Sequence, residues 1–166
     1  MKALIAYDSM FGNTEKIAQS ISDILAESVN VEMVKISKLN PKELKGFELV
    51  FVGSPTHRCK PSESVNVFLD NIPRRALKGI SVASFDTRYH MSKWLLWLAG
   101  SATKRIARKL KSKRGILLLK PESFIVTRRE GPLEDGELER ASLWSKTIIE
   151  AYNTNTNTIK KDNRRR

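Results

Sequence analysis

A short turn near the N-terminus combines hydroxyl side chains, a glycine and the start of a helix. It follows the apolar run of residues 3–7. The first backbone N–H groups of a helix have no intrahelical acceptor and lie at the positive end of the helix dipole, so they favour an anion. Gly12 would let the backbone approach that anion closely. The pattern predicts a phosphate-binding turn made of Ser9, Met10, Phe11, Gly12, Asn13 and Thr14.

This turn differs from the two common nucleotide-binding sequences. It lacks the glycine, lysine and Ser/Thr ending of a nucleoside-triphosphate loop, and it lacks the three spaced glycines of a dinucleotide fingerprint. A terminal phosphomonoester fits it better. The alternative is a strand, a turn and a helix that Asn13 or Thr14 caps, with no ligand.

Two further polar segments each follow an apolar run. Residues 49–53 lead into Ser54, Pro55, Thr56, His57 and Arg58, and residues 80–85 lead into Asp86, Thr87, Arg88, Tyr89 and His90. Their hydroxyl groups offer hydrogen-bond donors, while His57 and Tyr89 offer flat faces. We expect the two segments to flank a planar ring, although a loop histidine is more often simply solvated.

Strand and helix patterns alternate along the chain, as in a parallel α/β sheet. Nearly continuous apolar runs indicate strands that are buried on both faces, and an alternating run indicates an edge strand. The expected strands are residues 3–7, 29–34, 49–53, 80–85 and, divided by Pro121, 116–119 with 124–126. The pattern predicts five parallel strands with helices on both faces, and the polar segments lie at the carboxyl edge of that sheet.

Composition indicates one domain with an uneven positive charge. The chain has 166 residues, 40% of them hydrophobic, and a net charge of +12. Basic residues gather in 104–114 and 160–166. Such charge attracts acidic proteins, nucleic acid or anionic lipid through a long-range field. We expect residues 1–152 to form the domain and residues 153–166 to form a basic, disordered tail.

The sequence also favours the cytoplasm. It has one cysteine, Cys59, which excludes an internal disulfide and agrees with a reducing compartment. The strand expected from residue 3 leaves no room for a signal peptide, and the apolar run at residues 94–98 is too short to cross a bilayer. That run favours a core or oligomer contact, with a hydrophobic docking rim as the alternative.

Four segments, taken in order, resemble the flavodoxin family, especially its short archaeal and bacterial members. They are residues 9–15, 53–56, 85–89 and 130–133, and the resemblance covers roughly residues 1–152. It implies a flavodoxin-like three-layer sandwich with strand order 2-1-3-4-5 and FMN as the cofactor. It places residues 9–14 around the phosphate, 54–58 beside the ribityl chain and ring, and 86–90 on the other side.

Two features depart from that family. The family's phosphate turn usually has a hydroxyl at its third position, where this chain has Phe11, so one phosphate donor is missing. Typical flavodoxins are acidic, whereas this chain is strongly basic. The resemblance therefore supports FMN as the cofactor more strongly than it supports the partners of typical flavodoxins.

Three functions are consistent with these observations. The first is an FMN protein that shuttles electrons between redox partners, and its basic surface predicts a partner with an acidic surface. The second is an FMN-dependent NAD(P)H:quinone-type reductase that acts on a small-molecule acceptor. The third is a non-redox, anion-binding module. Nucleic acid is a less favoured partner, and peripheral membrane contact stays open. The candidate segments contain no catalytic triad and no metal cluster.

Overall fold

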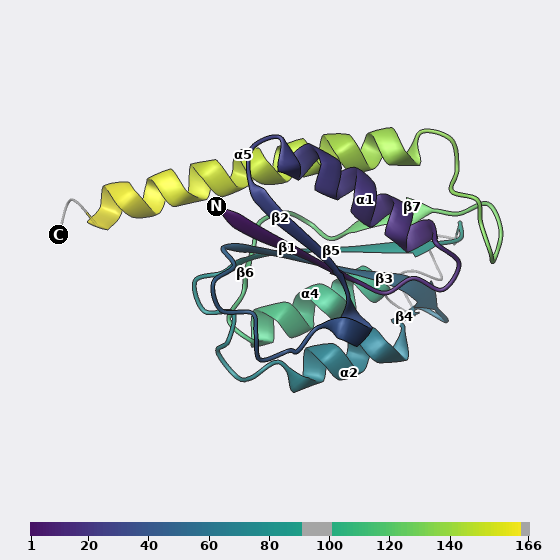
Figure 1. Ribbon diagram of the computed structural model, residues 1–166, viewed down its shortest axis with the longest axis horizontal. Coiled ribbons are helices and arrows are strands. Elements are labelled where there is room, and N and C mark those ends of the chain that lie inside the picture. Colours follow the sequence, from purple (N-terminus) through teal and green to yellow (C-terminus); the bar gives the residue numbers. More distant parts are fainter. Residues whose placement is uncertain (91–100, 164–166) are drawn as a thin grey trace.

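The computed structural model describes residues 1–90 and 101–163, with side chains through residue 157 (Figure 1). The apolar run at residues 94–98 lies outside the described residues. The elements, in order, are β1 (Lys2–Tyr7), α1 (Asn13–Ala26), β2 (Asn30–Lys35), η1 (Ile36–Lys38), β3 (Leu49–His57), β4 (Lys60–Pro61), α2 (Glu63–Asn71), β5 (Ser81–Arg88), α4 (Ala102–Ser112), β6 (Ile116–Leu117), β7 (Glu122–Ile125) and α5 (Glu137–Asn163).

The strand order agrees with the prediction. The sheet runs β2-β1-β3-β5-β6, and β7 continues beside β5 after the interruption at Pro121. When β6 and β7 are counted as one divided fifth strand, this order is 2-1-3-4-5. The sheet has seven strands rather than five because the fifth is split and because β4 adds a two-residue antiparallel pair to β3. Proline lacks the N–H that a continuous ladder requires.

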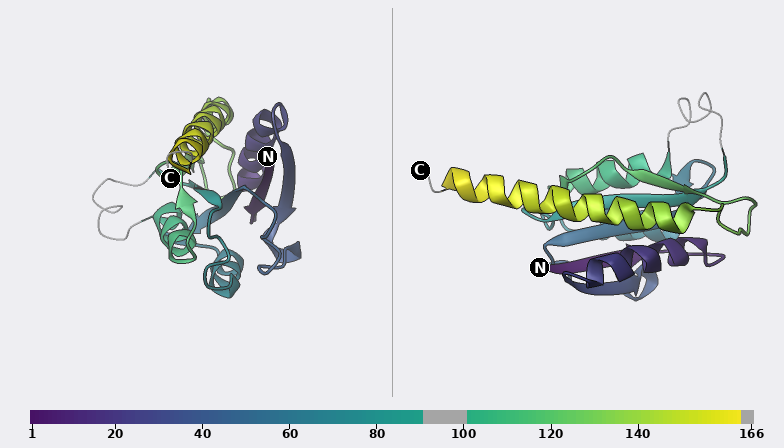
Figure 2. Two further views of the ribbon diagram at one scale, coloured as in Figure 1. Left: turned by 90° about the vertical axis from the view of Figure 1, so that its left-hand side faces the viewer. Right: turned by 90° about the horizontal axis from the view of Figure 1, so that it is seen from above.

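Helices cover both faces of the sheet, which gives three layers (Figure 2). Helices α1 and α5 lie on one face, while α2 and α4 lie on the other. Side chains that alternate along β1 serve both cores: Ile5 packs toward the α1 and α5 side, and Leu4 packs toward the α2 and α4 side. No described helix combines the length and the apolar character needed to cross a membrane.

The two central strands extend further than the apolar runs predicted. Strand β3 continues to His57 and β5 to Arg88, so most of the expected loops are strand. Ser54 pairs with Asp86 and Pro55 with Thr87, while β7 pairs with the other edge of β5. Backbone pairing with neighbours outweighs the polar character of these side chains, since buried N–H and C=O groups require partners.

The C-terminal segment also differs from the expectation of a disordered tail from residue 153. Helix α5 continues to Asn163 and extends beyond the sheet on the side of the N-terminus (Figure 1). Thr154 Oγ1 donates to the Glu150 carbonyl at 2.9 Å, and Thr156 Oγ1 donates to the Tyr152 carbonyl at 2.9 Å. These polar side chains bond back to the helix rather than to turns. The domain boundary at residue 152 stays a prediction.

Gly53 pairs with Phe85 in the two central strands and leaves room for its ring. A Cβ atom there would overlap the ring of Phe85, which is fully buried on the neighbouring strand. We expect Gly53→Ala to lower the free energy of unfolding by about 1–3 kcal/mol through overpacking. Urea unfolding measures this change.

A double variant tests the cause of that loss. Phe85→Leu on its own leaves a cavity and also destabilises the protein. In the presence of Gly53→Ala, however, the smaller side chain at residue 85 relieves the overlap. The double variant should therefore lose less unfolding free energy than the two single variants lose together. Strictly additive losses would contradict a direct clash between residues 53 and 85.

Candidate functional site

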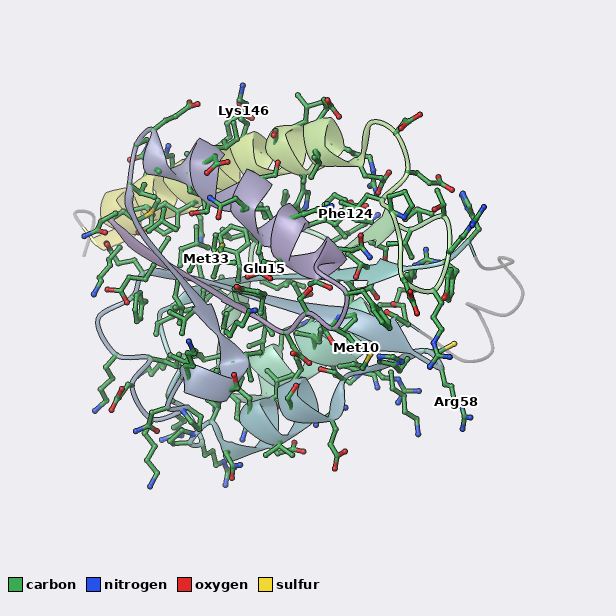
Figure 3. All side chains as sticks on the ribbon, turned by 45° about the vertical axis from the view of Figure 1, so that its right-hand side comes forward. Met10, Glu15, Met33, Arg58, Phe124 and Lys146 are labelled. Atoms are coloured by element: carbon green, nitrogen blue, oxygen red, sulfur yellow. The ribbon has the colours of Figure 1, made fainter. Side chains whose placement is uncertain are left out.

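A cavity of about 560 Å³ opens at the carboxyl edge of the sheet. It is formed by the turn after β1, the ends of β3 and β5, and the segment after β7. Figure 3 shows Met10 and Arg58 at this end of the molecule. Of the residues predicted from the sequence, those that line the cavity are Ser9, Met10, Phe11, Asn13, Thr14, Pro55, Thr56, His57, Arg58, Thr87, Arg88, Tyr89 and His90.

Three predicted residues do not line the cavity, and three lining residues were missed. Gly12, Ser54 and Asp86 do not line the cavity but lie next to residues that do. The missed residues are Cys59, Val126 and Arg129. Cys59 has no CxxC partner that would have indicated a functional thiol. Val126 and Arg129 follow β7, so the rule that ligands bind at the carboxyl ends of parallel strands would have indicated them.

The turn after β1 has the geometry expected of an anion-binding turn. Gly12 has φ of +83°, a left-handed conformation that glycine adopts without steric cost, and its carbonyl accepts from Lys16 N at 3.0 Å. Ser9 Oγ accepts from Glu15 N at 3.3 Å. Helix α1 starts at Asn13, so its first N–H groups lie at the cavity with no intrahelical acceptor.

The side chains at the start of α1 do not cap the helix. Asn13 Nδ2 donates to the Glu130 carbonyl at 3.0 Å, and the Thr14 and Thr87 hydroxyls are 2.7 Å apart. The first contact joins the turn to the segment after β7, and the second joins it to β5. Capping of α1 by the Asn13 or Thr14 side chain is therefore not observed.

A tight turn between β3 and β4 forms a second wall. Arg58 and Cys59 have φ of 45° and 63°, and they connect the paired residues His57 and Lys60. Two successive left-handed residues make a type I′ turn, in which Asn-Gly is usual. Such strain in residues other than glycine is frequent at functional sites, although Arg75 and Arg114, which do not line the cavity, also have positive φ. Buried Ser54 secures the turn, since its Oγ accepts from Ser62 N at 2.9 Å.

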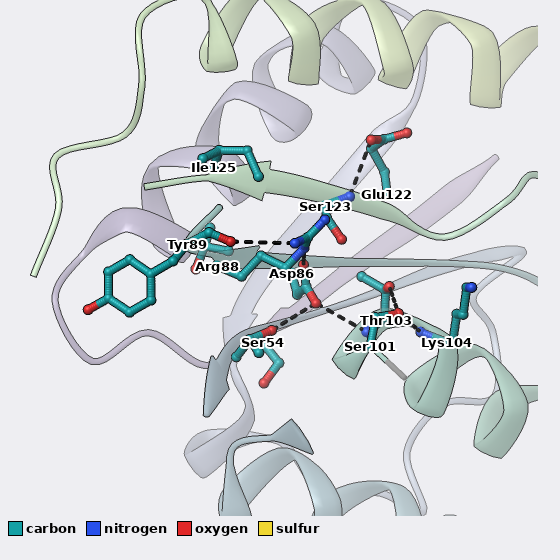
Figure 4. A network of polar contacts seen from close by, with 12 residues as sticks. Ser54, Asp86, Arg88, Tyr89, Ser101, Thr103, Lys104, Glu122, Ser123 and Ile125 are labelled. Carbon is teal, nitrogen blue, oxygen red and sulfur yellow. Dashed lines mark hydrogen bonds and ion pairs between the residues drawn. The ribbon is translucent and has the colours of Figure 1, made fainter. Parts of the chain in front are cut away.

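Asp86 connects the cavity wall to the start of α4 (Figure 4). It is fully buried, and its Oδ2 accepts from Thr56 Oγ1 at 2.8 Å and from Thr103 N at 3.3 Å. Arg88 Nε lies 4.0 Å from Oδ1, which gives electrostatic attraction without a hydrogen bond. Burial raises the pKa of Asp86, although the Thr56 hydrogen bond and the Arg88 charge oppose that rise.

The donors and surfaces of the cavity fit a phosphate ester that carries a planar ring. The start of α1 and Ser9 offer donors to an anion. His57 Nε2 is buried, it has no hydrogen-bond partner among the described residues, and the His57 side chain lines the cavity. Met10, Phe11 and Tyr89 are large, exposed apolar side chains that line the same cavity. An exposed apolar group of this kind is typical of a ligand-binding surface.

We expect Asp86→Asn to stabilise the protein increasingly as pH rises. Because burial raises the pKa of Asp86, the native state holds the proton more tightly than the unfolded state does. The resulting stability is complete below the unfolded pKa of about 4 and is lost as pH rises through the raised native pKa. Asparagine does not ionise, so urea unfolding should show a free-energy gap between variant and wild type that grows over this range.

Asp135→Asn provides the control, because Asp135 is an exposed carboxylate. Its free-energy gap from the wild type should stay nearly constant over the same pH range. For Asp86→Asn, a gap that shrinks with rising pH would show that attraction to Arg88 outweighs burial.

Comparison with known proteins identifies the family. The family model of the flavodoxin domain matches residues 4–94. An uncharacterised protein of Methanocaldococcus jannaschii is 34% identical over 116 residues, which cover 68% of each chain. A probable flavodoxin of Bacillus subtilis is 34% identical over 89 residues, which cover 52% of this chain and 56% of that protein.

The fold agrees with that match. The solved structure of an archaeal flavodoxin is 25% identical, with a TM-score of 0.73, and the alignment covers 92% of this chain and 99% of that chain. The family model alone covers more than half of the 166 residues. The chain therefore belongs to the flavodoxin family.

Proposed function

We propose that this flavodoxin-family protein binds FMN in the cavity at the carboxyl edge of the sheet and transfers electrons between redox partners. The observation that supports this most strongly is that the start of α1, with its free N–H groups, and the exposed rings of Phe11 and Tyr89 line one cavity. FMN supplies the chemistry when bound, because it accepts and releases electrons one or two at a time.

Different residues of the cavity would bind the two ends of the cofactor. The N–H groups at the start of α1 and the Ser9 hydroxyl would bind the phosphate. Phe11 and Tyr89 would cover the ring and exclude water, and the His57 side chain would lie beside it. The Thr14–Thr87 and Asn13–Glu130 contacts would hold these parts in fixed positions.

The proposed redox partner has an acidic surface. Lys104 and Arg108 are exposed on α4, and the start of α4 is tied to the cavity wall by the hydrogen bond from Thr103 N to Asp86. Positive charge beside an electron-transfer site attracts an acidic protein and orients its approach. We also propose a cytoplasmic location, which the unpaired, buried Cys59 supports.

The cofactor assignment is tested by releasing and rebinding the flavin. Denatured protein should release FMN on chromatography, and apoprotein should bind added FMN, which fluorescence quenching follows. Recovery of tightly bound FAD, or failure of apoprotein to bind FMN, would contradict the proposal. Oxidation of NAD(P)H with a quinone would instead indicate a reductase.

Thr14→Ala is expected to weaken FMN by about 10-fold and riboflavin much less. The Thr14 hydroxyl can accept from the Thr87 hydroxyl and still donate to a charged phosphate oxygen, and the variant loses that donor. Thr14→Ser is the matched control, since it keeps the hydroxyl group and should keep FMN affinity near that of the wild type. Fluorescence titration of the three apoproteins measures both ligands. Equal weakening of FMN and riboflavin would show that Thr14 does not contact the phosphate.

Reversing the charge of α4 is expected to slow association with an acidic electron donor. Lys104→Glu with Arg108→Glu should lower the second-order rate several-fold at low salt, and the difference should shrink as salt screens the field. Stopped-flow absorbance measures the rate. Lys146→Glu is the control, because Lys146 is exposed on α5, on the other face of the sheet (Figures 2 and 3). The control changes the net charge by half as much, so a control effect half as large in the logarithm of the rate would point to net charge rather than to α4.

A further inference from the structure

The segment after β7 folds back toward the start of α1. Val126 forms an isolated bridge with Leu133, and Thr127 N donates to the Pro132 carbonyl at 2.9 Å. Inside this loop, Gly131 N donates to the Arg128 carbonyl at 3.1 Å. The loop therefore has a defined shape, and one of its side chains, Arg129, lines the cavity.

Two contacts place this loop against the phosphate end of the cavity. The Glu130 carbonyl, next to Arg129, accepts from Asn13 Nδ2 at 3.0 Å. Gly131 has φ of +102°, and a Cβ atom there would lie 2.5 Å from Asn13 Oδ1. The loop backbone thus packs directly on the residue that begins α1. The backbone next to Arg129 is therefore held at the start of α1.

Arg129 is also available for a ligand. Its side chain is exposed, and no ion pair involves it within residues 1–90 and 101–163. Arg88 is held differently, since its Nη1 donates to the Tyr89 carbonyl at 3.4 Å and its Nε lies near Asp86. Arg58 belongs to the β3–β4 turn. Arg129 is the cavity arginine that lies closest along the chain to the contacts with Asn13.

The turn after β1 offers few side-chain donors to an anion. Met10 and Phe11, which line the cavity there, carry no hydrogen-bond donor in their side chains. A guanidinium offers two parallel N–H donors and a full charge to phosphate oxygens, which makes a stronger contact than a neutral hydroxyl. We propose that Arg129 binds the phosphate of the flavin and makes this site selective for the phosphorylated ligand. This inference rests on the proposed binding of FMN.

Titration of apoprotein with FMN and with riboflavin tests the inference without measuring electron transfer. Arg129→Gln is expected to weaken FMN by about 10-fold, which corresponds to about 1.4 kcal/mol, and to leave riboflavin affinity unchanged. Arg129→Lys keeps the charge but not the paired donors, so its FMN affinity should lie between those of the wild type and Arg129→Gln. Unchanged riboflavin affinity also reports that the cavity is intact.

Arg128→Gln is the matched control, because Arg128 is an adjacent exposed arginine that does not line the cavity. It removes the same net charge and should leave the ratio of FMN to riboflavin affinity unchanged. If wild-type apoprotein binds FMN but Arg129→Gln keeps the wild-type ratio, or if Arg128→Gln lowers the ratio equally, the role of Arg129 is overturned. If wild-type apoprotein binds no FMN, the proposed function itself fails.

Discussion

The parallel pairing of β3 with β5 is the constraint on which the rest of the structure depends. Its register places Ser54 opposite Asp86 and Pro55 opposite Thr87, so the pairing continues past the apolar centre into the cavity wall. Gly53 permits the close approach because a side chain there would overlap Phe85. Thr87 then meets Thr14, which fixes the start of α1 to the same strand. Two strands thereby position both the turn that would bind an anion and the surfaces that would flank a ring.

The sequence predicts the strands of the sheet and most residues of the candidate site, because both depend on local patterns of apolar and polar residues. Continuous apolar runs identify strands that are buried on both faces, and Pro121 identifies the break in the fifth strand. The ends of β3 and β5 were interpreted as loops because their residues are polar, whereas their pairing depends on neighbouring strands that a local pattern does not contain. The carboxyl-end rule would have indicated Arg129, which follows β7, but the contact between Asn13 and Glu130 that holds its loop against α1 joins residues far apart in the chain.

Charged side chains of this protein lie both at the exposed surface and in the buried interior. Exposed lysine and arginine side chains on α4 produce a long-range field that salt screens. Asp86, by contrast, is fully buried next to the cavity. A buried carboxylate lowers the stability of the fold unless it is hydrogen-bonded. Thr103 links the two, because its N–H donates to Asp86 at the first turn of α4. The buried carboxyl group of Asp86 therefore anchors the helix that carries the surface charge.

Helix α5 has a practical consequence. It begins near the cavity and runs past the opposite edge of the sheet, so residues around Asn163 lie far from the turn at residues 9–14 (Figures 1 and 2). A copy immobilised through that end of the helix on an electrode or a bead would face solution with its cavity open. Attachment near residue 130 would instead place the support against the start of α1, since that loop contacts Asn13.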